Sequence, residues 1–367
     1  MNDDAQEQSG AARDLGPISA VVVNYNGEAY LEACLRSLQA QTVPLDEIVV
    51  VENASTDGSL NVLNTHFRDV ELVRMTSNVG PCIARNVGMR AAQYRFILLV
   101  DNDVVLEPNV VERLRDELAR RPDAVMAQPR SVFKSDPGRI HYDGGRLHYA
   151  GLISLFHFGE VDRRARIPPV EEIDAAISLC LLLDKKEVIE AGGFDEAFFI
   201  LFEDLDLSHR LRLAGHTILK VNDALALHDD GTAGISFREE KADYPARRVF
   251  FHSRNRWLYM TKCFRLWTLL VALPGILVYE VAWLLFALKE GNAGAWLKGK
   301  YAFLRAFREA RRKRRWVQRR RKIGDRALLV GGPLTLSPNL ASSRGLGARL
   351  LDGVLRAWWG LCRWFVV

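Results

Sequence analysis

The feature that most constrains this chain is a short apolar run that ends in two carboxylates. Phe96–Val100 is apolar without interruption and is followed by Asp101-Asn102-Asp103. The run is too short for a helix, and its aromatic and β-branched residues favour a strand buried on both faces. Ligands of open α/β sheets bind outside the carboxyl ends of the strands. Two carboxylates there could share a divalent cation through oxygen, although Asp-Asn-Asp is also ordinary turn chemistry.

Strand-like and helix-like segments alternate through the first two thirds of the chain. Strands are expected over Ile18–Tyr25, Asp46–Val51, Val70–Met75, Arg95–Asp101, Ala124–Phe133 and His216–Val221. Helices are expected over Leu60–Phe67, Gly80–Gln93, Pro108–Arg121 and Leu205–Ala214. Such alternation predicts an α/β fold with a mostly parallel central sheet flanked by helices. Ser135–Glu172 has no clear period.

Composition limits the class of protein. The chain has 367 residues and is 49% apolar, which suffices for one large domain or two ordinary ones. Its five cysteines are scattered and odd in number, so we expect reduced thiols and no zinc site. Met1–Leu15 is polar and acidic and lacks the apolar stretch of a secretory signal. We interpret residues 1–16 as a disordered tail before a cytoplasmic body at 17–250.

The last third of the chain predicts contact with a membrane. Leu266–Leu288 contains a single charge, Glu280, and is long enough to cross a bilayer. Lys289–Arg326 is strongly basic, which favours anionic lipid. Arg349–Val367 separates basic residues from Leu, Val and Trp on two helical faces. We therefore expect a membrane-associating segment at 251–326, and a linker with a C-terminal amphipathic helix at 327–367.

The apolar segment has three possible placements: a buried core helix, a span, or an interfacial helix. A single crossing would put the basic segment on the far side of the membrane from the body. The positive-inside tendency opposes that arrangement. We expect a re-entrant or in-plane helix, helped by Pro274-Gly275.

Two polar clusters in the first half suit a nucleotide. Val49–Ser59 ends a strand with Glu52, Asn53 and Asp57, where an amide oxygen could accept from a pyrimidine ring N–H. The same residues are also good turn formers. A helix begins within Asn78–Gly88, and an arginine lies one turn into it. A helix start and an arginine together suit a diphosphate, but an ordinary capped helix with a surface arginine has the same pattern.

Two more clusters lie in the second half. Glu203, Asp204 and Asp206 open a helix after an aromatic run. The helix dipole favours acids there, and Asp206 with Arg210 is a plain i, i+4 pair. His228 follows a strand, and a lone histidine is more often structural than a ligand.

In this order and spacing, the clusters resemble the inverting family 2 glycosyltransferases with the GT-A fold, in particular bacterial rhamnosyltransferase-like members. The resemblance spans about Ile18–Ser236. It implies that Asp101, Asp103 and His228 hold Mg²⁺ or Mn²⁺. It also implies that Asp204 is the general base, with Glu203 beside it. The donor positions that it implies are Asn24, Asn53, Asp57, Asn78, Gly80, Arg85 and Asn102. Position 52 is usually Asp in that family and is Glu here.

The resemblance implies transfer of a hexose from a nucleoside-diphosphate sugar to a hydroxyl acceptor. One positioned carboxylate would take the proton of the acceptor, and the metal and Arg85 would stabilise the departing diphosphate. We expect a glycan or lipid-linked acceptor of the cell envelope and an anionic membrane surface as partners, at the cytoplasmic face of the cell membrane. No nucleic-acid partner is expected, although the arginines of 311–322 would fit one.

Three alternatives share part of the pattern. A nucleotidyltransferase usually carries a Gly-rich loop with Arg and Lys after its first strand, whereas Asn24–Tyr30 has no basic residue. A glycosidase also uses two carboxylates but needs neither the Asp-x-Asp nor the diphosphate-type helix start. A catalytically inactive membrane adaptor with the same fold is the remaining alternative.

Overall fold

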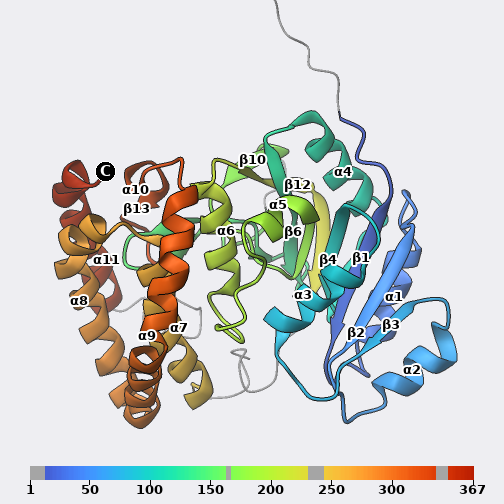
Figure 1. Cartoon of the computed structure of the whole chain (residues 1–367), viewed down its shortest axis with the longest axis horizontal. Coiled ribbons are helices and arrows are strands. Elements are labelled where there is room, and N and C mark those ends of the chain that lie inside the picture. The colour runs from blue at the N-terminus through green and yellow to red at the C-terminus, as the bar shows by residue number, and fades with distance from the viewer. Residues whose placement is uncertain (1–12, 163–166, 230–243, 336–345) are drawn as a thin grey trace, which may run out of the picture.

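The computed structural model describes residues 13–162, 167–229, 244–335 and 346–367. Most of the tail expected at 1–16 lies outside these ranges. The centre is a ten-stranded sheet with the strand order β10-β12-β6-β11-β4-β1-β2-β3, while β5 and β7 pair with β12 and β6 (Figure 1). The strands are β1 (Ile18–Asn24), β2 (Glu47–Glu52), β3 (Glu71–Arg74), β4 (Phe96–Asp101), β5 (Val104–Leu106), β6 (Ala124–Phe133), β7 (Ile140–Tyr142), β10 (Val170–Ile173), β11 (Cys180–Asp184) and β12 (Thr217–His228).

The α/β prediction is confirmed, and the sheet is mixed. Strands β3, β2, β1 and β4 run parallel, because helices cross over between them. Strand β11 joins β4 and β6 antiparallel and links this part to the parallel pair β6 and β12. The stretch without a clear period, Ser135–Glu172, contains β7 and the start of β10.

Helices cover both faces of the sheet. The helices of the body are α1 (Leu31–Gln39), α2 (Ser59–His66), α3 (Pro81–Ala91), α4 (Val110–Arg120), α5 (Lys185–Glu190) and α6 (Glu203–Leu213). Helices α1 and α4 share a core cluster with Ala20 and Val22, whereas Val21 points to the other face, towards α3. Gly88 lets α3 approach, since a Cβ there would lie 2.3 Å from a methyl group of Val21. Strand β4 is buried on both sides, as its apolar run predicts.

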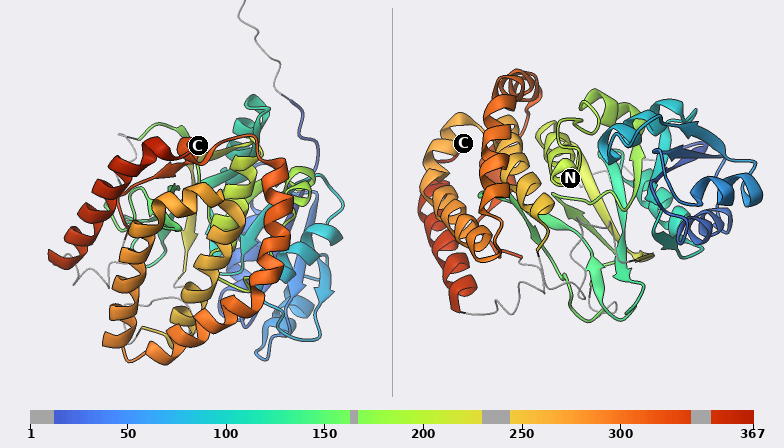
Figure 2. Two further views of the ribbon diagram at one scale, coloured as in Figure 1. Left: turned by 60° about the vertical axis from the view of Figure 1, so that its left-hand side comes forward. Right: turned by 90° about the horizontal axis from the view of Figure 1, so that it is seen from below.

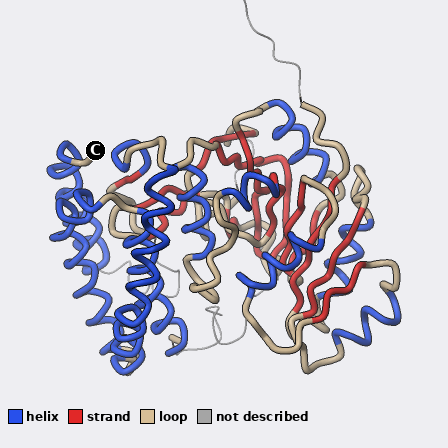
Figure 3. The backbone as a smooth tube through the Cα atoms, viewed as in Figure 1, coloured by secondary structure: helices blue, strands red, loops and turns tan. Residues whose placement is uncertain are grey.

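A helical layer lies beside the sheet body (Figures 2 and 3). It consists of α7 (Ala246–Cys263), α8 (Leu266–Lys289), α9 (Ala293–Arg320), α10 (Asp325–Leu328) and α11 (Leu346–Cys362). A second sheet ties this layer to the body: β13 (Leu329–Val330) pairs with β8 (Gly145–His148), which also pairs with β9 (Leu152–Leu155). Residue 250, the expected end of the body, lies within α7. The five cysteines are free and buried, as expected.

Candidate active site

The carboxyl ends of β4 and β12 bring Asp103 and His228 together. Strand β12 ends at His228, where it pairs with Val104 of β5. This places His228 Nε2 3.5 Å from Asp103 Oδ2, and the Asp229 amide donates to the Asp103 carbonyl. His141 stacks on the imidazole of His228, with ring centroids 4.4 Å apart. Two of the three predicted metal ligands are therefore neighbours.

The chemistry of these residues fits a divalent cation. Burial raises the pKa of Asp103 to about 6, Asp101 adds to the rise, and His228 opposes it. A buried carboxylate of this kind gains from a positive partner. Carboxylate oxygens and an imidazole nitrogen are ligands that Mn²⁺ accepts, and Mg²⁺ favours the oxygens. In the described ranges, no three acidic, His or Cys side chains already stand together as a metal cage.

Arg85 lies one turn into α3 and connects two predicted parts of the site. Its Nη2 donates to Asp101 Oδ1 at 2.7 Å, and its Nη1 lies 3.6 Å from Glu203 Oε1. The surrounding carboxylates outweigh burial and raise the pKa of Arg85. Among the described residues, the buried Nη1 atom has no hydrogen-bond partner. The guanidinium can therefore still bind an anionic oxygen.

Glu203 and Asp204 open α6, as the sequence predicts, and differ in environment. Glu203 is 5% exposed, and burial together with Asp204 raises its pKa to about 8. Asp204 is half-buried. Burial also raises the pKa of Asp204, but Arg85 and a hydrogen bond from Ser178 Oγ oppose that rise. Asp204 is thus the more exposed of the two acids and the one whose carboxylate accepts from Ser178.

Asp206 belongs to a buried ion-pair network. Its Oδ2 accepts from Arg210 Nε at 2.8 Å, and its Oδ1 lies 2.7 Å from Lys262 Nζ in α7. The i, i+4 pair was expected, whereas no local signal in the sequence points to Lys262. The role of Asp206 is to fasten α6 to α7.

The predicted donor residues cross-link the loops that follow β1, β2, β3 and β4. Asn102 donates to Asn24 Oδ1 at 2.7 Å, and Asn24 donates to Glu52 Oε2 at 2.6 Å. Asn53 Oδ1 accepts from the Val79 amide, and its Nδ2 donates to Asn78 Oδ1 at 3.1 Å. The structure thus brings these side chains to one edge of the sheet, where they hold the loops together. Their contacts to a nucleoside stay predictions.

Glu52 and Asp57 are also used within their loop. The second carboxylate oxygen of Glu52 accepts from the Ser55 amide at 2.6 Å, so the longer side chain folds back on its own turn. Asp57 accepts from the amides of Glu28 and Ser59. Burial acts to raise the pKa of Asp57, but hydrogen bonds from Ser59 and these amides outweigh it, and the pKa is lowered. Gly80, with φ 82°, starts α3 beside this loop.

The chain is similar to known glycosyltransferases. Residues 19–167 match the family described as Glycosyl transferase family 2. An N-acetylglucosaminyl-diphospho-decaprenol L-rhamnosyltransferase of Mycobacterium tuberculosis is 27% identical over 265 residues, which cover 66% of this chain and 83% of that protein. Residues 19–167 are therefore the part of this chain that is similar to glycosyltransferase family 2. Another relative, the glycosyltransferase EpsH of Bacillus subtilis, is 30% identical over 124 residues. These residues are 33% of this chain and only 36% of that relative.

Solved structures show that this chain has the GT-A fold. A structure of GalNAc-T7 with UDP, GalNAc and Mn²⁺ superposes with a TM-score of 0.54 at 16% identity, covering 75% of this chain and 54% of that one. S. aureus TarS 1-349 in complex with UDP-GlcNAc gives a TM-score of 0.52 at 16% identity, covering 83% of this chain and 88% of that one.

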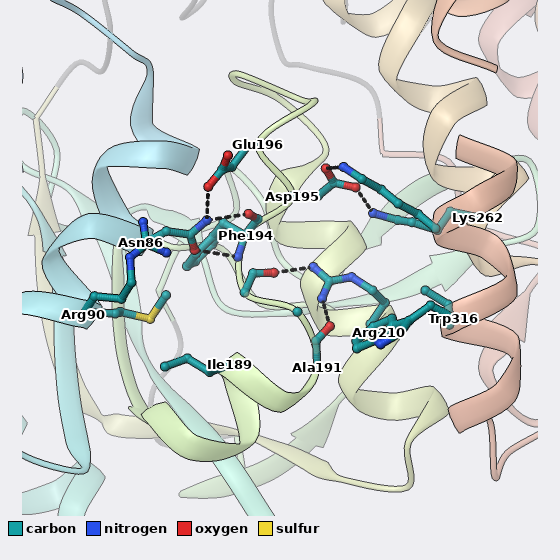
Figure 4. A pocket seen from close by; sticks show the side chains of 15 residues that line it. Asn86, Arg90, Ile189, Ala191, Phe194, Asp195, Glu196, Arg210, Lys262 and Trp316 are labelled. Atoms are coloured by element: carbon teal, nitrogen blue, oxygen red, sulfur yellow. Dashed lines mark hydrogen bonds and ion pairs between the residues drawn. The ribbon is translucent and has the colours of Figure 1, made fainter. Parts of the chain in front are cut away.

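A cavity of about 410 Å³ lies apart from the candidate site, between α3, the turn after α5, α6 and α9 (Figure 4). Its described lining includes none of the predicted site residues. Four of its charged groups have partners: Arg210 donates to backbone carbonyls of the turn, and Asp195 pairs with Lys262 and Lys313. We interpret it as a structural junction between the body and the helical layer.

Sequence reasoning missed two residues next to the proposed base. Ser178 donates to Asp204, and Asn255 of α7 holds the loop that precedes α6. Both lie far from Asp204 in the sequence, and neither belongs to a recognisable pattern. Only the fold shows their contacts.

Proposed function

We propose that this glycosyltransferase moves a hexose from a nucleoside-diphosphate sugar to a hydroxyl of a lipid-linked or cell-surface glycan precursor. The observation that carries the proposal is the meeting of Asp101, Asp103, Arg85 and Asp204 at one sheet edge. The unsatisfied Nη1 of Arg85 supports an anionic ligand there. The name of the mycobacterial relative supports a lipid-diphosphate acceptor.

The residues of the chain divide the chemistry between them. Asp204 takes the proton of the acceptor hydroxyl as it attacks the anomeric carbon. Arg85 stabilises the charge that develops on the departing diphosphate. Asp101, Asp103 and His228 would hold Mg²⁺ or Mn²⁺, which when bound supplies further positive charge against the diphosphate. A direct displacement inverts the anomeric centre and needs no enzyme nucleophile.

A donor panel tests the proposal. Uridine, thymidine and guanosine diphosphate sugars are incubated with the full chain, with and without Mn²⁺ or Mg²⁺, and release of the nucleoside diphosphate is measured. We expect metal-dependent release from one of these donors, and little release by the matched variant Asp204→Asn. Binding of a donor without any turnover, in the presence of acceptor lipid extract, would favour the inactive adaptor.

The apolar surface of the helical layer supports a location at a membrane. Of the described helices, α8 alone is long and apolar enough to cross a bilayer by length and composition. One face of α8 packs on the protein along its whole length, and the opposite face is exposed. The exposed large apolar residues of α8 are Leu266, Trp267, Leu270, Leu273, Leu277, Val278, Val281, Leu285 and Leu288.

The single acidic residue of α8 faces the protein. Glu280 accepts from Arg256 at 2.7 Å, from Trp257 Nε1 at 2.9 Å and from Trp296 Nε1 at 3.0 Å, and it also pairs with Lys300. These partners come from α7 and α9, so the middle of α8 is fixed to both neighbours. A helix bound in this way along one face suits the plane of a membrane better than a span.

Helix α9 adds both apolar and basic groups. Its exposed apolar residues are Leu297, Tyr301, Leu304 and Phe307. Its exposed basic residues are Lys298, Arg305, Arg308, Arg311, Arg312, Arg315, Arg319 and Arg320. Apolar side chains flanked by cations are typical of helices that lie on anionic lipid. We propose that the outer faces of α8, α9 and α11 rest on the cytoplasmic face of the cell membrane.

Flotation with vesicles tests the membrane proposal. The double variant Leu297→Glu/Leu304→Glu should float less with vesicles that contain phosphatidylglycerol, because charge now enters the apolar face. Ile189→Glu is the matched control, since Ile189 is also exposed (47%) but lies on α5 of the body. Equal flotation of both variants and the unmodified chain would contradict the proposed face.

A further inference from the structure

The loop before the proposed base has an unusual backbone. Phe199, Leu201 and Phe202 adopt positive φ values of 65°, 68° and 73°. Residues with bulky side chains rarely occupy this region and stay there only where their surroundings hold them. Phe202 is also the N-cap of α6, and no side chain of the described chain caps that helix start. The position of Asp204 therefore depends on whatever holds this loop.

Asn255 of α7 holds the loop that precedes α6. The residue is completely buried, and its Nδ2 donates to the carbonyls of Phe198 at 3.1 Å, Ile200 at 2.9 Å and Leu201 at 2.8 Å. Its Oδ1 accepts from Arg254 Nε at 2.8 Å, which fixes the orientation of the amide. Buried carbonyls need donors, and one side chain serves three of them.

Contacts from neighbouring residues also fix the position of this loop. Arg254 Nη2 donates to the carbonyls of Ala197 and Phe198. On another side, the ring of Phe199 packs on the start of α3, where a Cβ on Gly80 would lie 2.6 Å from it. The turn upstream is fastened by Asn86, which exchanges hydrogen bonds with the backbone of Phe194 (Figure 4).

We propose that Asn255 is a positioning residue for glycosyl transfer. It holds the loop 198–202 with Phe199, Leu201 and Phe202 in their left-handed conformation, so that α6 begins where Asp204 can meet the acceptor hydroxyl. The inference rests on the proposed role of Asp204 as base. Ser178 donates to the carboxylate of Asp204, whereas Asn255 binds the backbone of the loop. Without the Asn255 amide, the loop would relax to ordinary backbone angles and shift the start of α6.

The test compares three variants of the full chain. Asn255→Leu keeps most of the volume and removes the N–H donors. Arg254→Met leaves Asn255 in place but removes the hydrogen bond that orients its amide, together with the two hydrogen bonds from Arg254 to the loop. Ser253→Ala is the control, because Ser253 is equally buried on α7 but binds Trp283 of α8. Turnover of the donor found in the panel is measured together with amide hydrogen exchange of residues 197–206.

A displaced base should lower kcat and leave donor binding intact. We expect Asn255→Leu to reduce kcat by about thirtyfold or more, since small misplacements cost up to about a hundredfold, with donor KM within about threefold. Exchange should accelerate within 197–206, Arg254→Met should act in the same direction more weakly, and Ser253→Ala should match the unmodified chain.

Two results would overturn the inference. Unchanged exchange in Asn255→Leu would show that the amide does not hold the loop, and faster exchange with unchanged kcat would show that the loop does not position the base. If Asn255→Leu fails to fold, Arg254→Met decides by the same criteria. An unmodified chain that turns over no nucleotide sugar refutes the proposed function instead, and the exchange result then decides alone whether Asn255 holds the loop.

Discussion

Glu203 and Asp204 are adjacent acids that differ in their surroundings. The pKa of Glu203 rises from 4.5 to about 8 because the side chain is buried beside Asp204. The folded chain thus keeps a proton on Glu203 that the unfolded chain releases above pH 4.5. This contribution to stability is complete below pH 4.5 and is lost as the pH rises through about 8.

Glu203→Gln should remove that pH dependence, because the amide mimics the protonated acid. We expect the Tm of the unmodified chain to fall between about pH 5 and about pH 8, and the Tm of the variant to stay flatter. Thermal unfolding across this range measures both. A parallel decline in the two chains would show that Glu203 is not the group responsible.

Asp103 supplies a second prediction at the scale of the residue. Asp103→Ala should abolish the Mn²⁺-dependent part of nucleoside diphosphate binding, since the variant loses a buried oxygen ligand beside His228. Calorimetric titration of the nucleoside diphosphate with and without Mn²⁺ measures the effect. Asp223→Ala, at an exposed acid of β12, is the control and should bind as the unmodified chain does. Mn²⁺ dependence that survives in Asp103→Ala would contradict the metal assignment.

At the scale of the element, the packing of α3 on β1 depends on Gly88. A Cβ at this position would lie 2.3 Å from Val21 and 2.9 Å from Val51, so α3 would have to move outward. Gly88→Ala should destabilise the fold by about 1–3 kcal/mol, as overpacked cores do. Urea unfolding gives the value, with Gly347→Ala as the control because that glycine has open space around its Cα. Equal losses in both variants would argue against close packing at this point.

Elements with a local pattern were predictable, and those defined by distant partners were not. Strand β4 follows from its apolar run, and α6 from its leucines and its acidic first turn. Strand β12 was expected to end at Val221, but it continues to His228, because an irregularity between Val221 and Leu225 breaks its alternation. That continuation is what brings His228 to Asp103. The contacts of Ser178 and Asn255 leave no trace in the local sequence, since each joins residues of separate elements.

At the scale of the whole molecule, the C-terminal helices are part of the fold. Sequence patterns place the motifs before Ser236, which predicts that a chain ending at Lys262 could still bind donor. In the structure, Gln318 and Arg314 of α9 bond the carbonyls at the end of α7, and Gly299 packs against Phe250. We expect the shortened chain to lose cooperative unfolding, because α7 would lose its cover. Differential scanning calorimetry of the shortened chain tests this expectation. A single sharp unfolding transition would show that the body does not depend on the C-terminal helices.

The central claim, that Asp204 is the base, is tested most directly by comparing Asp204→Asn with Asp206→Asn. We predict that Asp204→Asn lowers kcat by about 10²–10⁴ with little change in donor affinity or stability. Asp206→Asn should retain far more of its turnover and lose stability, by up to about 3–5 kcal/mol, since it weakens a buried network with Arg210 and Lys262. Near-normal turnover by Asp204→Asn, with Asp206→Asn folded but inactive, would contradict the account.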